Sequence, residues 1–122
     1  MFLGDWANST ANEILMDFID YPKKDNYVAN DDIEILLAYY LYEDYSGTAF
    51  VLFKQNGKLY EVNGSHCSCY GLEGQWDPDE TTVESLRHRL ENGNLGTEYS
   101  WRGDNLKNTF EAELVKVLDS LA

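Results

Sequence analysis

The chain has 122 residues, 22 of them acidic and 9 basic, and its formal net charge at pH 7 is −13. This length is typical of a single domain, and 43% hydrophobic residues are enough to form a core without a metal or a disulfide. The charge disfavours direct binding to nucleic acid and to anionic membrane surfaces. The sequence has neither an apolar run of about 20 residues nor the features of a secretory signal, so we expect a soluble protein.

The first predicted helix covers residues 10–21. Thr10 and Glu13 have the spacing of a capping box, in which each residue satisfies a free amide of the first helical turn. Pro22 ends the helix because a proline disfavours helical geometry in the residue before it. The apolar residues repeat with the spacing of one buried helix face: Ala11, Ile14, Leu15, Phe18 and Ile19.

Three strands are predicted next, at 33–43, 47–55 and 58–63. The first of these segments also has the apolar spacing of a helix, but its isoleucine and tyrosine content favours a strand. Asn56-Gly57 between the other two segments is typical of a type I′ turn, which tolerates positive φ angles at both residues. We therefore expect a three-stranded antiparallel meander.

The two-residue turn fixes the register of the hairpin, pairing Phe53 with Tyr60 and Val51 with Val62. These four side chains should face the helices. The alternate residues should lie on the other, more exposed face, where Glu61→Lys would be nearly silent: Leu52, Leu59 and Glu61.

Two further helices are predicted near 78–92 and 105–121. In the first, Asp77 is placed as the N-cap, Pro78 as the first helical residue and Glu80 as the third, and Gly93 ends the helix. The order of the elements predicts a single α+β domain over residues 1–122, with helices covering one face of an antiparallel sheet.

The segment around the two cysteines has three interpretations. His66, Cys67 and Cys69, with His88 as a fourth ligand, offer the donor atoms that zinc prefers, but zinc-binding cysteine pairs usually have two to four residues between them. The same residues could form a cysteine nucleophile with a histidine base. We favour a turn with half-buried thiols, without metal or cofactor. Cys67 and Cys69 are too close to form a stabilising disulfide, and we expect them to be reduced in a cytoplasm.

Acidic residues are dense just before and within the predicted second helix. The spacing of an EF-hand calcium loop is missing, and solvated carboxylates are the simplest interpretation. We call these residues the acidic segment and take them as the candidate partner-binding residues: Glu73, Asp77, Asp79, Glu80 and Glu84. Tyr70, Trp76 and Trp101 could form an exposed aromatic patch beside it, although packing at the edge of the core is favoured.

Between residues 47 and 81 the chain resembles a group of small uncharacterised proteins of bacteriophages and prophages. The resemblance rests on four pieces: Gly47–Phe53, Gly57–Val62, Ser65–Glu73, which contains the distinctive run His66-Cys67-Ser68-Cys69-Tyr70-Gly71, and Gln75–Pro78. It implies a phage-encoded protein acting in the bacterial cytoplasm, and it implies no activity.

These observations favour an acidic protein that binds and inhibits or modulates a bacterial protein with a basic surface, by imitating the charge of nucleic acid. The oligomeric state stays open. Two alternatives remain: a metal- or thiol-dependent protein centred on His66, Cys67 and Cys69, and an accessory structural protein of the phage particle.

Overall fold

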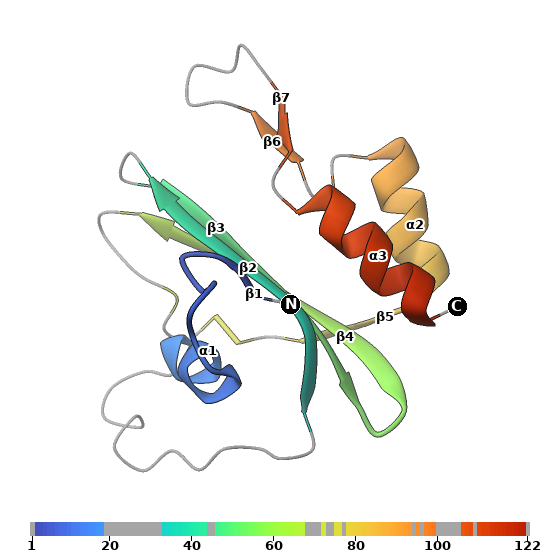
Figure 1. Ribbon diagram of the computed structural model, residues 1–122, viewed down its shortest axis with the longest axis horizontal. Helices are drawn as coiled ribbons and strands as arrows, with labels where there is room; N and C mark the ends of the chain where they lie inside the picture. The colour runs from blue at the N-terminus through green and yellow to red at the C-terminus, as the bar shows by residue number, and fades with distance from the viewer. Residues whose placement is uncertain are drawn as a thin grey trace. The chain divides into compact units, whose positions relative to one another are not determined.

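The computed structural model describes most of the chain (Figure 1): residues 2–18, 33–43, 46–67, 72, 75–76, 78–93, 95, 97–99, 106–108 and 110–121. The chain divides into two compact units, Met1–Glu80 and Thr81–Ala122. Helices and a mixed sheet together make it an α+β protein, as the sequence predicts. That the whole chain is one domain stays a prediction.

The sheet has five strands in the order β1-β2-β3-β4-β5 (Figure 1). Its strands are β1 (Phe2–Gly4), β2 (Glu34–Glu43), β3 (Ser46–Gln55), β4 (Lys58–Cys67) and β5 (Asp79–Thr81). Pairing is antiparallel between β2 and β3 and between β3 and β4, but parallel between β1 and β2. The predicted sheet of three antiparallel strands was therefore too small and lacked the parallel pair, because three-residue strands are too short to show a period.

The β3–β4 hairpin confirms the predicted turn and register. Asn56 and Gly57 have φ angles of 54° and 79°, the left-handed conformation that a type I′ turn requires. Phe53 lies opposite Tyr60, and Val51 lies opposite Val62. The local sequence therefore determines the alignment of these two strands.

Strand β2 contains a β-bulge. Ile35 pairs with Phe53, whereas Leu37 pairs with Leu52, so Leu36 is the additional residue of the bulge. The bulge changes the alternation of side chains along β2. It thus brings Ile35 and Ala38 into the same hydrophobic cluster although they are three residues apart.

One face of the sheet packs against the N-terminal segment. Helix α1 (Ala11–Asp17) begins at Thr10 with the predicted capping box: Thr10 Oγ1 accepts from the Glu13 amide at 3.2 Å, and Glu13 Oε1 accepts from the Thr10 amide at 3.0 Å. The helix ends at Asp17, and Phe18 is its C-cap rather than a helical residue as predicted, while residues 19–21 lie outside the described residues. The buried cluster joins this segment to the central strands: Trp6, Ile14, Phe18, Ala38, Ala49, Val51, Phe53, Val62 and Leu72.

The other face of the central strands is also buried, which corrects the prediction of a more exposed face. Leu52 is 0% exposed and Glu61 is 6% exposed, while Leu59 is half-buried. The Glu61 carboxylate accepts a hydrogen bond from Asn63 Nδ2 at 3.2 Å, so this burial does not leave it unsatisfied. Glu61→Lys would bury an ammonium group in place of the carboxylate, and we no longer expect it to be silent.

The second unit contains α2 (Val83–Asn92), β6 (Thr97–Tyr99), β7 (Leu106–Asn108) and α3 (Glu111–Leu121). The two helices lie side by side (Figure 1). Strands β6 and β7 pair antiparallel. The predicted third helix over 105–121 therefore began too early, because Leu106–Asn108 is held in extended conformation by its partner strand.

The start of α2 also differs from the prediction. The predicted helix over 78–92 begins only at Val83, and Thr82 is its N-cap, with Thr82 Oγ1 accepting from the Ser85 amide at 3.1 Å. Asp79 and Glu80 belong to β5, so Pro78 is not a first helical residue and Glu80 is not in the first turn. Asp77 was the N-cap that the sequence predicted. Residues 79–81 form a strand instead, so the helix begins later and Thr82 is its N-cap. Gly93 follows the last helical residue, as predicted.

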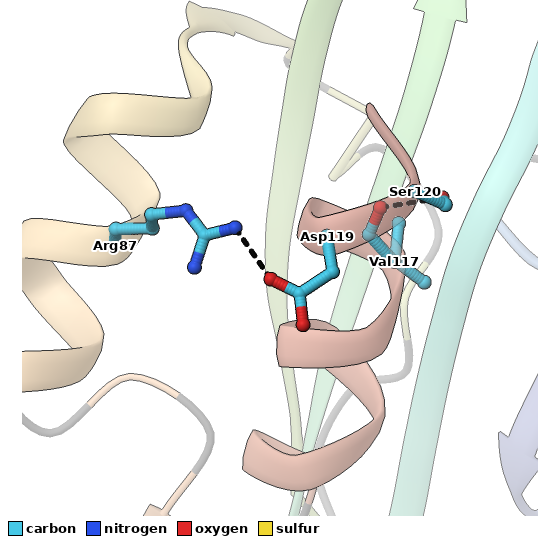
Figure 2. A network of polar contacts seen from close by, with 4 residues as sticks. All are labelled: Arg87, Val117, Asp119 and Ser120. Carbon is cyan, nitrogen blue, oxygen red and sulfur yellow. Dashed lines mark hydrogen bonds and ion pairs between the residues drawn. The ribbon is translucent and has the colours of Figure 1, made fainter. Parts of the chain in front are cut away.

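Two polar contacts involve the C-terminal half of α3, and one of them reaches the middle of α2 (Figure 2). Arg87 Nη2 lies 2.7 Å from Asp119 Oδ1, joining α2 to α3, and Ser120 Oγ donates to the Val117 carbonyl at 2.7 Å. Because the Arg87 and Asp119 side chains are both open to solvent, the ion pair contributes less than about 1 kcal/mol. Apolar packing stabilises this unit more, through buried residues such as Leu86 and Leu114. None of the helices within the described ranges is long and apolar enough to cross a membrane.

Candidate functional site

Three residues of the acidic segment can be placed in the structure. Asp79 and Glu80 lie in β5 at the end of the first unit, and Glu84 lies in the first turn of α2 in the second. All three side chains are exposed. Glu73 and Asp77 lie outside the described residues.

None of these three carboxylates has a hydrogen bond or an ion pair with the part of the chain that the structure describes. The sequence assigned Glu80 a capping role that would explain its charge without any partner. Thr82 takes over that role, so Glu80 is left without it. Only Glu84 keeps a local electrostatic function, because a negative charge in the first turn of a helix interacts favourably with the helix dipole.

The histidine and cysteine residues can be placed only through their backbone. His66 and Cys67 are the last two residues of β4, opposite Gly47 and Ser46 of β3. Cys69 and Tyr70 lie outside the described residues.

His88, the proposed fourth ligand, is exposed on α2 in the second unit. Its ring Nδ1 is 3.2 Å from Asn92 Nδ2, which also donates to the His88 carbonyl at 3.4 Å. Within the described ranges, no group of three or more histidine, cysteine, aspartate and glutamate residues is arranged to hold a metal ion. The metal and thiol interpretations therefore gain no support from these residues.

Trp76 packs at the edge of the core, as the sequence analysis favoured. Its ring stacks on Phe53 at 5.3 Å between centroids and meets Phe18 edge-on at the same distance. Phe53 in turn stacks on Tyr60 at 5.4 Å. Trp76 is half-buried, and packing in this column of rings explains its position without an external binding partner. Trp101 lies outside the described residues.

Trp6 is an important core residue that the sequence analysis missed. It is buried, its Nε1 donates to Asp17 Oδ2 at 2.8 Å, and its ring packs against Phe18 and Tyr40. The segment around it has no regular period, so no pattern indicated that it belongs to the core.

Comparison of the chain with protein-family models, with curated proteins and with solved structures gives no match. The acidic segment is therefore a candidate on physical grounds alone.

Proposed function

We propose that this chain is a phage-encoded acidic protein that binds a bacterial protein with a basic surface, in the host cytoplasm, and inhibits or modulates it. The observation that carries the proposal is the exposure of Asp79, Glu80 and Glu84, without local partners among the described residues, in a chain with a net charge of −13.

Like charges close together in the sequence repel one another and lower the stability of the folded state. A basic partner would relieve this repulsion. Salt bridges within the chain are a different solution, but with 9 basic residues against 22 acidic ones most carboxylates cannot be paired internally. The surplus of negative charge is therefore available to an external surface.

Grooves that bind nucleic acid are the basic surfaces with the strongest positive potential, because they are built to hold a row of phosphates. A chain of this charge would be drawn to such a groove by long-range attraction, and would compete with nucleic acid for it. Electrostatic steering of this kind raises the association rate and is screened by salt over about 8 Å at physiological ionic strength.

The test compares two variants with the same net charge. The first changes Asp79→Asn, Glu80→Gln and Glu84→Gln. The control changes three acids outside the acidic segment to glutamine: Glu34, Glu91 and Glu113. Wild type and both variants are immobilised, incubated with bacterial lysate at low ionic strength and eluted with increasing salt.

The expected result is a host protein with a basic surface that the wild type and the control retain and the first variant loses. Circular dichroism should show that all three proteins are folded. A partner retained equally by both variants would mean that overall charge, rather than the acidic segment, attracts it. Recovery of no partner by the wild type would contradict the proposal.

A further inference from the structure

The sequence contains three Asn-Gly pairs, at 56–57, 63–64 and 92–93. An asparagine followed by glycine can deamidate spontaneously, because the amide nitrogen of a residue without a side chain approaches the asparagine side-chain carbon with little hindrance. The three pairs share this local sequence and differ only in structure. We propose that Asn56 is a site of spontaneous deamidation in the folded protein and that Asn63 and Asn92 are protected.

Asn56 and Gly57 form the exposed two-residue turn between β3 and β4. In the part of the chain that the structure describes, neither the Asn56 side chain nor the Gly57 amide makes a hydrogen bond. A Cβ atom built on Gly57 would meet nothing within 4 Å. Among the described residues, both reacting groups are thus free of hydrogen bonds, and the turn has open space in which the Gly57 nitrogen can approach Asn56 Cγ.

Asn63 and Gly64 lie inside β4, where they pair with Phe50 and Ala49 of β3. Asn63 Nδ2 donates to Glu61 Oε1 at 3.2 Å. The space around Gly64 is filled, since a Cβ there would lie 3.2 Å from Leu72 Cδ2. Reaction at this pair requires part of the ladder to open first.

Asn92 and Gly93 are fixed at the end of α2. The Gly93 amide, which would be the nucleophile, donates to the Arg89 carbonyl at 3.0 Å. Asn92 Nδ2 donates to the His88 carbonyl at 3.4 Å and lies 3.2 Å from its ring Nδ1. Both reacting groups must therefore give up hydrogen bonds before they can meet.

At Asn56 the reaction proceeds in two steps. The Gly57 nitrogen bonds to Asn56 Cγ and loses its proton, while the bond from Cγ to Nδ2 breaks and Nδ2 leaves as ammonia. Water then adds to one of the two carbonyl carbons of the resulting five-membered imide and breaks its bond to nitrogen. Opening at one carbonyl gives aspartate, and opening at the other gives isoaspartate.

Either product adds one negative charge at the hairpin tip, between Lys54 and Lys58, which are both exposed. Isoaspartate also inserts an additional carbon into the main chain of a turn whose two residues must both have positive φ. The β3–β4 hairpin carries much of the core, so accumulation of isoaspartate should lower the stability of the first unit.

The experiment follows the untagged wild-type protein at mildly alkaline pH, with peptide mapping by mass spectrometry and an enzymatic assay for isoaspartate. Asn56 should convert at least about tenfold faster than Asn63 or Asn92, because the latter must first break hydrogen bonds. In denaturant the three sites should react at similar rates. Asn56→Gly, which keeps a residue that accepts positive φ, should abolish the fastest conversion.

Equal or faster conversion at Asn63 or Asn92 in the folded protein would overturn the proposal. So would an intact Asn56 after a time in which the denatured chain has reacted. A preference for Asn56 that persists in denaturant would show that sequence rather than structure sets the order, and would also overturn it.

Discussion

Replacing Leu52 by alanine tests whether the central strand β3 is buried on both faces. Leu52 is fully buried and lies opposite Leu37 on β2, which is also 0% exposed, and opposite Glu61 on β4. Truncation of a fully buried leucine costs about 2–5 kcal/mol, since the transfer of its side chain is lost and a cavity remains. Against a total stability of about 5–15 kcal/mol, this loss is large.

Urea unfolding followed by tryptophan fluorescence provides the measurement, because Trp6 and Trp76 both lie in the first unit with the sheet. The chain has two compact units, so the slope with denaturant must be compared between variants before free energies are subtracted.

Lys54→Ala is the matched control, since Lys54 lies two residues from Leu52 on the same face of β3 but is exposed. Its cost should stay within about 0.5 kcal/mol. If Leu52→Ala costs no more than this control, the second face of the sheet is open and the reasoning from burial is wrong.

Two further substitutions test the backbone assignments. Gly4→Ala should lower the free energy of unfolding by at least about 2 kcal/mol, because φ is 66° and the new Cβ would collide with the Tyr40 carbonyl oxygen. Gly57 has a similar φ of 79° but lies in open space, so Gly57→Ala should cost only about 1 kcal/mol in the same urea titrations. Thr82→Ala should destabilise α2 by about 1 kcal/mol through loss of its N-cap, whereas Asp77→Ala should leave the helical circular dichroism signal and its melting unchanged. A larger loss of helix stability for Asp77→Ala than for Thr82→Ala would instead support the helix start near residue 78 that the sequence predicts.

The parts of the fold that the sequence predicts well are those with a strong local signal. Asn56-Gly57 determines the hairpin turn and, with it, the pairing of β3 and β4. Thr10 and Glu13 determine the start of α1 in the same way. In each case a few adjacent residues contain all the required chemistry, so no knowledge of distant contacts is needed.

The parts that were missed depend on distant partners. Strand β1 exists because Phe2–Gly4 lies beside β2, and no pattern within three residues can indicate that. The bulge at Leu36 places Ile35 and Ala38 in one cluster, and no local pattern indicates where a strand gains an additional residue. Burial of Glu61 was also unpredictable, since a charged residue in an alternating strand normally indicates the solvent face.

For the candidate site, the sequence identified the acidic segment but misjudged its local structure. A helix start with Asp77 as N-cap would have given Asp77 and Glu80 a structural role. The observed N-cap is Thr82, so Glu80 does not have that role. Composition alone predicts an acidic surface. The helix boundaries determine which carboxylates have a capping role. These boundaries are set by strand pairing as much as by capping residues.

The parallel pair of β1 and β2 has a consequence for the kinetics of folding. Phe53 and Tyr60 meet across a turn of a few residues, whereas Phe2 must find Ala38, which lies 36 residues further along the chain. The entropy lost on closing a loop grows with its length, so the antiparallel strands should form early and β1 should join them late. Burial of Trp6, which follows β1 directly, would then mark the last step, and its fluorescence would report the slowest phase of refolding.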